Sequence, residues 1–372
     1  MIDWSWGLLT GPERAVLRRL AVFAGGCTLP AAEEVCAAPD VPTDTVLDVV
    51  TRLVDRSLVT VLDSEDGPRY RMLESVAAYA LERLEEAGES QLTRQRHRIH
   101  HTELAERSEP RLYGPDQRRW LRRLDSDSAN LRCALADAAA DPDAGGSGAD
   151  LAVRLVNALA WYWFLRGRLG EAGRSFDLAL GDVAPGGTAP GSADLGDHGP
   201  SHAARSSARV RQAAFALLAD DDAPPNQPTD GEYDGADTRA RWFLGLARCG
   251  FADASAEDRT AGLLAEFQAD DDRWGMAAMQ STRATEAMYR GNLTDLRRYA
   301  VDSAARFAEL GDRWGRLRAT EQLGVLAEIA GDYGEAARLH RDGVRIAEEL
   351  HLRTDVSFRL SRLGRIALLT GE

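Results

Sequence analysis

The C-terminal half of the chain repeats itself at an interval of 40 residues. The tetrapeptide Asp-Arg-Trp-Gly occupies residues 272–275 and again 312–315, and the same interval separates Gly291 from Gly331. A fixed period of this size indicates supersecondary units that stack on their neighbours. Within each unit, two runs of helical periodicity flank a glycine-containing break, which predicts two helices joined by a turn. The sequence therefore predicts an α-solenoid.

Length and composition are those of an ordinary soluble protein. The chain has 372 residues, of which 44% are hydrophobic and 28% charged. No run approaches the length of a membrane span, and the N-terminus lacks a basic segment followed by an apolar core. We therefore expect a cytoplasmic protein without a membrane partner. The four cysteines are scattered and form no CxxC pair, so neither a disulfide framework nor a zinc site is expected.

The sequence contains no lysine, so all 45 of its strongly basic residues are arginine. This excludes a lysine-bearing phosphate-binding loop and lysine-based covalent catalysis. There is also no nucleophile elbow, no set of paired metal ligands and no dinucleotide fingerprint. We expect no enzymatic activity and no metal or cofactor in this chain. The net charge of −14 disfavours non-specific nucleic-acid binding by the chain as a whole.

Residues 1–90 have the pattern of a winged helix. Three helical patterns precede two short β-rich runs, at residues 57–62 and 69–72, which are separated by turn residues. A further helix is predicted over residues 74–87. Three helices, a β-hairpin and a final helix make up a winged-helix domain, so the fold class is mainly α, with one small hairpin ahead of the solenoid.

The charge of this domain bears on whether it binds DNA. Residues 1–90 contain 8 arginines against 16 acidic residues, a net charge of −8. The predicted recognition helix carries Asp44, Asp48 and Asp55 against Arg52 and Arg56. Because phosphate neutralisation supplies most non-specific DNA affinity, we expect this domain to contact protein. The alternative is a DNA-binding transcription factor that uses the winged helix directly and the helical array for dimerisation.

Residues 91–140 are predicted to form a helical connector. Up to Leu124 this segment has nine arginines against four acidic residues. Such a cluster suits a solvated helix face, with a surface for an anion or an acidic partner as the alternative. His97, His100 and His101 fall near one face of a helix, but no further ligand of defined spacing accompanies them. Packing is therefore the favoured role of these histidines.

Residues 151–372 are assigned to the helical array. Two breaks rich in Gly, Pro, Ala and Asp, at about residues 181–201 and 220–237, are predicted to be disordered insertions. The last predicted helix lacks a partner, so we expect the array to continue beyond Glu372.

The concave face of a solenoid, lined by the first helix of each repeat, is suited to binding a protein or a small-molecule effector. We expect the aromatic run at residues 161–164 to serve mostly the core, with one or two side chains at a ligand groove. The candidate groove residues are Trp161, Trp163, Arg283, Glu286, Arg318, Glu321, Gln322, Arg359 and Arg362.

Several stretches resemble known families. The string Gly-Asp-Tyr-Gly-Glu-Ala at residues 331–336 resembles the tetratricopeptide (TPR) repeat in a long form. Trp-Ser-Trp-Gly-Leu-Leu at 4–9, Leu-Val-Asp-Arg-Ser-Leu-Val at 53–59 and Tyr-Arg-Met-Leu-Glu at 70–74 are similar to large bacterial STAND regulators. These are ATPase-containing transcription factors of the LuxR and SARP types.

The resemblance implies a regulatory role. In that family a DNA-binding domain and a P-loop nucleotide-binding domain accompany the winged helix and the TPR array, and neither of these two domains is in this chain. ATP or ADP is therefore expected only with the nucleotide-binding domain, and DNA is reached only indirectly. The implied function is that of a sensor whose array binds a signal and acts through the winged helix on that domain.

The resemblance also points to one site. Met72, Leu73 and Glu74 stand where related proteins have a Met-His-Asp motif whose histidine contacts the bound nucleotide. Leucine cannot donate a hydrogen bond to phosphate. We therefore expect these three residues to pack against the nucleotide-binding domain without touching the nucleotide.

Overall fold

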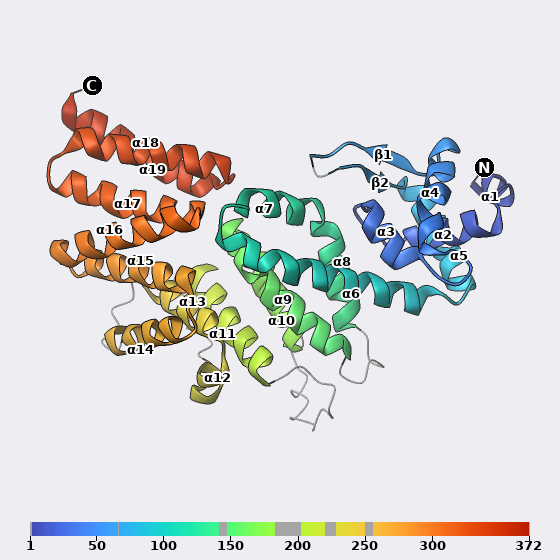
Figure 1. The fold of residues 1–372 in the computed structure, drawn as a ribbon, viewed down its shortest axis with the longest axis horizontal. Helices are drawn as coiled ribbons and strands as arrows, with labels where there is room; N and C mark the ends of the chain where they lie inside the picture. Colours follow the sequence, from blue (N-terminus) through green and yellow to red (C-terminus); the bar gives the residue numbers. More distant parts are fainter. Residues whose placement is uncertain are drawn as a thin grey trace. The chain divides into compact units, whose positions relative to one another are not determined.

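The computed structural model describes residues 2–65, 67–140, 147–182, 202–219, 228–249 and 256–371 (Figure 1). These ranges are mainly helical and contain one two-stranded sheet, as the sequence predicts. None of their helices combines the length and the apolar character that crossing a bilayer requires. They form two compact units: residues 2–107 with 122–155, and residues 108–121 with those from 156 onwards.

The first unit begins with the predicted winged helix. Its two strands pair antiparallel, with Val61 opposite Tyr70. The hydrophobic core lies between the helices. Val46, Val49 and Leu53 of α4 (Val46–Asp55), which is the predicted recognition helix, face inward at helical spacing. Its elements are α1 (Ile2–Gly7), α2 (Gly11–Leu20), α3 (Leu29–Cys36), η1 (Thr43–Thr45), α4 (Val46–Asp55), β1 (Thr60–Leu62), β2 (Arg69–Arg71) and α5 (Glu74–Glu86).

A buried ion pair attaches the second wing strand to the helices that follow the domain. Arg69 of β2 donates to Asp127 at 2.7 Å and to the carbonyl of Gly26 at 3.0 Å, and the amide of Asn130 donates to the same carbonyl at 2.9 Å. Removing either charge would leave its partner buried and unpaired, which is costly. The helices concerned are α6 (Ser90–Ser108), α7 (Gln117–Ser126) and α8 (Ser128–Ala139), with the short η2 (Glu109–Tyr113) between α6 and α7.

The second unit is built largely from antiparallel helical hairpins, and consecutive helices from α15 to α19 pack on each other. Eleven helices follow from residue 147 onwards in the part of the chain that the structure describes. They are α9 (Ser147–Leu165), α10 (Leu169–Leu180), α11 (His202–Ala219), α12 (Asp230–Gly235), α13 (Thr238–Arg248), α14 (Ala256–Ala269), α15 (Arg273–Tyr289), α16 (Leu293–Leu310), α17 (Arg313–Ile329), α18 (Tyr333–Glu349) and α19 (Arg353–Thr370).

The two predicted disordered insertions are only partly covered. Residues 183–201 and 220–227 lie outside the described residues. Residues 228–237, which the sequence assigned to the second break, are described and contain the short helix α12. A capping box between Thr229 and Glu232 starts this helix, a signal that the proline-rich surroundings concealed in the sequence.

The repeated Asp-Arg-Trp-Gly motif starts α15 and α17, and each of its residues has a separate structural task. The aspartate caps the helix: Asp272 accepts from the backbone N–H of Gly275 at 2.9 Å, and Asp312 from that of Gly315 at 2.6 Å. The tryptophan enters a shared aromatic core. The glycine allows the preceding helix to approach closely, because a Cβ atom at Gly315 would overlap the ring of Phe307.

An aromatic cluster forms the centre of the second unit. Trp242 of α13, Trp274 of α15 and Trp314 of α17 meet Trp161 of α9 with ring centroids 4.8–5.8 Å apart. Most of these pairs are edge-to-face, the geometry that aromatic quadrupoles favour. Trp274 and Trp314, at equivalent positions of two successive repeats, thus share one core with Trp242, which lies about one turn further into its helix.

Two glycine substitutions test the role of the motif glycine. Gly315→Ala should lower the free energy of unfolding by about 1–3 kcal/mol, because the new methyl group overlaps Phe307. Gly364→Ala in α19 is the matched control, since no described atom lies within 4 Å of its Cβ position. It should leave stability unchanged or raise it by up to about 1 kcal/mol. Urea denaturation measures both, and equal effects would contradict the packing role of Gly315.

Candidate functional site

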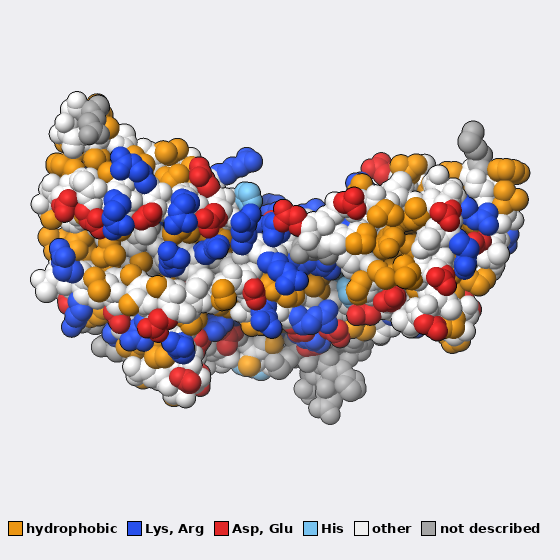
Figure 2. Space-filling model, turned by 45° about the horizontal axis from the view of Figure 1, so that its top comes forward, with side chains coloured by type: hydrophobic (Ala, Val, Ile, Leu, Met, Phe, Trp, Pro, Cys, Tyr) orange, Lys and Arg blue, Asp and Glu red, His pale blue; other side chains and the backbone are white. Residues whose placement is uncertain are grey.

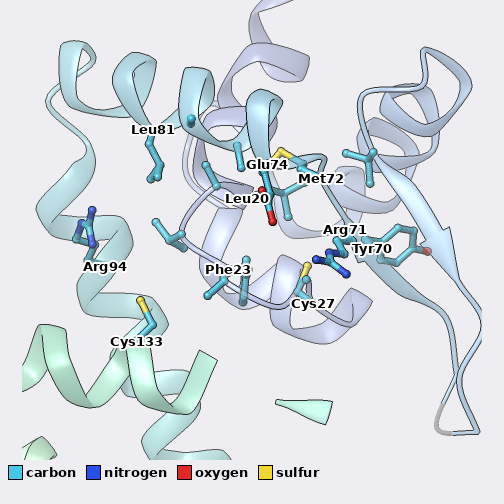
Figure 3. Close-up of a pocket in the computed structure, with 17 residues that line it drawn as sticks. Leu20, Phe23, Cys27, Tyr70, Arg71, Met72, Glu74, Leu81, Arg94 and Cys133 are labelled. Carbon is cyan, nitrogen blue, oxygen red and sulfur yellow. The ribbon is translucent and has the colours of Figure 1, made fainter. Parts of the chain in front are cut away.

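The first unit contains an apolar pocket of about 360 Å³ (Figure 3). Its walls come from the end of α2, the loop to α3, the end of β2, and helices α5, α6 and α8. Leu20, Phe23 and Leu81 provide much of the apolar lining. Arg94 and Cys133 lie at one end of the pocket and Arg71 at the other (Figure 3). This size and lining are typical of sites that bind an apolar body between a few polar groups.

Local backbone constraints shape the pocket. Gly26 has φ +75°, and a Cβ atom there would lie 2.6 Å from the carbonyl oxygen of Tyr70. This close approach allows Cys27 and Tyr70 to exchange two backbone hydrogen bonds of 2.8 and 2.9 Å. The loop after α2 is thereby held against β2, and the chain leaving β2 delivers Met72 and Glu74 to the pocket.

The polar groups of the pocket suit binding and not covalent chemistry. Burial raises the pKa of the Cys27 thiol to about 12 and also raises the pKa of Cys133, so neither is a ready thiolate nucleophile. Arg94 forms an ion pair with Asp137 at 3.2 Å. The charged groups at the opposite end are Arg71 and Glu74, which are both exposed.

The structure brings two of the three predicted docking residues to this pocket. Met72 is half-buried against the winged-helix core, and Glu74 begins α5 at the pocket rim. Leu73, between them, is 60% exposed. Figure 2 shows hydrophobic side chains gathered on the surface of the first unit. An exposed leucine beside an apolar pocket is a feature of protein-contact surfaces.

The recognition helix presents a negatively charged surface. Asp44, Asp48 and Asp55 are exposed. The guanidinium groups of Arg52 and Arg56 lie 3.4 and 3.6 Å from a carboxylate oxygen of one acidic residue, Glu13. The negative charge of Glu13 therefore partly neutralises Arg52 and Arg56, the two arginines of the predicted recognition helix.

Glu13, which sequence reasoning missed, is held in place by its own helix. It is 1% exposed and accepts the backbone N–H of Thr10 at 2.8 Å in a capping box. Burial alone would raise the pKa of Glu13, but the hydrogen bonds from Thr10 and the charges of Arg56 and Arg52 lower it below its usual value. The capping-box spacing of Thr10 and Glu13 is visible in the sequence, but the partners of the carboxylate are not.

The predicted groove residues of the second unit fall into separate groups. Trp161 and Trp163 lie in the packed interior. Arg283 and Glu286 line one small cavity of about 130 Å³ with Tyr299.

The remaining candidates join helices to one another. Arg318 pairs with Glu321 at 2.7 Å, and the buried Arg359 lies 3.9 Å from the same carboxylate. Arg362 pairs with Glu328 at 2.9 Å. Gln322, which is 1% exposed, donates to the carbonyl of Ser281 at 2.8 Å.

The three histidines of α6 pack in the first unit. His97 and His101 are buried side by side, with ring centroids 4.2 Å apart, and His97 contacts Phe23 behind the pocket. His100 contacts the carboxylate of Glu34. Across the described ranges, no group of three or more His, Cys, Asp or Glu residues is arranged to hold a metal ion.

Residues 9–85 match the family model of the winged helix-turn-helix domain, which agrees with the observed fold. Over 368 residues the chain is 30% identical to proteins of Mycobacterium tuberculosis and Mycobacterium bovis named "Putative HTH-type transcriptional regulator". The match covers 93% of this chain and 39% of each relative. The chain thus spans about two-fifths of the length of these relatives.

A shorter match is closer in sequence. Over 100 residues the chain is 45% identical to an uncharacterized protein of Mycobacterium tuberculosis, covering 27% of this chain and 25% of that protein. The winged-helix match and the similarity to proteins named as transcriptional regulators together support a regulatory role.

The buried histidine behind the pocket predicts acid sensitivity. Burial lowers the pKa of His97 from 6.5 to about 4, so the folded protein holds it neutral while the unfolded chain takes up a proton. Stability from this group is therefore present above pH 6.5 and is lost as the pH falls towards 4, at about 1 kcal/mol per pH unit. Urea denaturation across this range should give a shallower pH slope for His97→Leu than for the wild type. Equal slopes would contradict the prediction.

Proposed function

We propose that this chain is the signal-receiving portion of a cytoplasmic STAND-type transcriptional regulator of the LuxR or SARP kind. In this proposal the winged helix is a protein-contact module that docks a nucleotide-binding domain not in this chain. The helical array, of long TPR type, binds a protein or small-molecule signal. The chain itself carries no catalytic activity and reaches DNA only through the rest of the regulator.

One observation carries the protein-contact role: the electrostatics of the recognition helix. Its arginines, Arg52 and Arg56, face the buried carboxylate of Glu13, and its exposed acids face solvent. A helix in the DNA major groove lies between two phosphate backbones, where exposed carboxylates are repelled. The acidic surface therefore favours a partner other than DNA.

The apolar pocket supports the docking role. It lies beside the chain segment that leaves β2: Met72 and Glu74 line the pocket, and the exposed Leu73 stands between them in the chain. A protein partner would bury Leu73 and meet the rim charges of Arg71 and Glu74. This arrangement, with an apolar centre and a charged rim, is that of a protein interface. Because Leu73 stands where related proteins have a nucleotide-contacting histidine, this segment makes no hydrogen bond to the nucleotide in our proposal. The docked domain alone binds the nucleotide.

The helical array supports the sensing role because its helices repeat at a fixed interval. Many weak contacts along such an array add to a usable affinity. The small cavity beside Arg283 and Glu286 is one place where a polar signal molecule would find groups of both charges. The buried aromatic cluster serves the packing of the array.

A DNA-binding assay tests the protein-contact role. Fluorescence anisotropy with promoter DNA at 50 mM salt should show no binding that depends on Arg52 or Arg56, because the exposed aspartates repel phosphate. The double variant Asp44→Arg, Asp48→Arg should gain affinity by about tenfold or more and lose it again at high salt.

The opposite result would be salt-sensitive DNA binding by the wild type that is abolished by Arg52→Ala and Arg56→Ala. It would support the alternative function, a winged helix that binds DNA directly. Failure of the charge-reversed variant to bind would show that charge is not what prevents binding.

Calorimetry with the purified nucleotide-binding domain of a STAND regulator tests the docking role. Leu73→Asp should weaken the complex by at least about tenfold, because a carboxylate would be buried in an apolar interface. The melting temperature of the Leu73→Asp variant alone should equal that of the wild type, since the Leu73 side chain is 60% exposed. Leu92→Asp in α6 is the matched control, because this leucine is 52% exposed and does not line the pocket.

Equal losses for the two leucine variants would contradict docking at the pocket. The chain alone should bind neither ADP nor ATP tightly. Tight nucleotide binding that depends on Leu73 would also contradict the proposal.

A further inference from the structure

The segment at residues 109–117, here called the strap, joins helices that belong to the first unit. Residues up to 107 and from 122 to 155 belong to the first unit, whereas residues 108–121 pack within the second. The chain therefore leaves one unit, contacts the helical array and returns. Both ends of the strap continue as helices, α6 before it and α7 after it.

The strap first contacts α13 and α15 through an aromatic ring. Tyr113 stacks on Trp161, with ring centroids 5.5 Å apart, and meets Trp274 edge-on at 4.5 Å. The guanidinium carbon of Arg239 lies 4.3 Å from the centre of the tyrosine ring. Arg239 also pairs with Asp272, the cap of α15, at 2.8 Å. The tyrosine is thus held by residues that begin two successive repeats.

A buried amide makes the contact with α17. Gln117 is 0% exposed, and its amide nitrogen donates to the carbonyl of Leu112 at 2.7 Å and to Asp312 at 3.2 Å. Its amide oxygen accepts the backbone N–H of Trp314 at 3.1 Å. Asp312 also accepts the indole N–H of Trp274 at 3.1 Å. The amide therefore closes a network that spans the strap, α15 and α17.

The turn of the strap fits a matching turn of the array. Gly311, which ends α16 with φ +69°, would place a Cβ atom 3.1 Å from the Cβ of Pro115. A Cβ atom at Gly114 would lie 3.6 Å from the carbonyl oxygen of Leu310. The turn of the strap is therefore seated against the array, with the two turns in close van der Waals contact.

We propose that the strap is the element through which the helical array controls the winged-helix unit. Solenoids change curvature by small rotations between repeats. The strap binds the starting ends of α13, α15 and α17 together, so a rotation between these helices has to move Tyr113 or break the bonds of Gln117. Both outcomes act on α6 and α7 through the covalent chain. This inference rests on the proposed sensing function and gives it a physical connection.

Coupling requires an element with two states, and in this proposal the strap is that element. In the seated state its contacts with three repeats are satisfied together. In the released state the hydrogen bond between Gln117 and Asp312 is broken and both side chains are solvated. Tyr113 then no longer packs in the tryptophan cluster. A signal that changes the spacing of the array's first helices would shift the balance between the two states.

Hydrogen–deuterium exchange of the whole chain tests this role. Gln117→Ala should speed amide exchange by at least about tenfold in residues 109–121 and also in α6, which the strap continues. Gln322→Ala is the matched control. This similarly buried amide donates its hydrogen bonds to Ser281 and Thr285 of α15. Its effects should stay within α15 and α17.

A second variant separates release of the strap from misfolding. Gln117→Met keeps the side-chain volume while removing all three hydrogen bonds, so it should speed exchange in the strap and α6 with an unchanged circular dichroism spectrum. Faster exchange confined to the strap and the start of α17, or equally fast exchange in α6 for Gln322→Ala, would overturn the proposal. The assay contains no DNA, nucleotide or partner protein, so its failure is distinguishable from failure of the proposed function.

Discussion

The second unit depends on aspartates that serve two repeats at the same time. Asp312 caps α17, and its carboxylate also accepts the indole of Trp274 from the preceding repeat and the amide of Gln117. Asp272 caps α15 and accepts Arg239 in the same manner. Burial raises the pKa of Asp312 to about 7 despite its donors, so each donor matters for keeping the charged form inside. Helix capping, repeat stacking and the seating of residues 109–117 are consequently one coupled network.

The first unit separates two surfaces of different chemistry. The recognition helix presents carboxylates, and its arginines are drawn towards Glu13 inside the domain. The pocket beside β2 presents apolar groups with a charged rim. We propose that a winged helix arranged in this way is a protein-contact module, because its exposed carboxylates would be repelled by DNA phosphates and its apolar pocket has a charged rim.

Residue patterns placed the candidate groove residues on helices, where the structure has them, but did not show what covers them. The aromatic run at 161–164 was assigned mainly to the core, and Trp161 lies there because tryptophans from three later repeats surround it. Arg359 has the charge of a surface residue, yet it is buried beside Glu321 of the neighbouring repeat. Helical spacing identifies a face of a helix, whereas the neighbouring helix decides whether that face meets solvent.

The sequence by itself determined the helical hairpins and the winged helix, because the information for each lies within a few dozen consecutive residues. Apolar spacing, capping aspartates and the glycines that end helices act locally, so period and boundaries can be predicted. Only the tertiary structure decided that the motif glycines receive the rings of Phe267 and Phe307, that Glu13 offsets Arg52 and Arg56, and that Gln117 binds Asp312 across nearly 200 residues of chain. Such contacts depend on how separate elements are placed in space, and the local rules that form each element do not specify that placement.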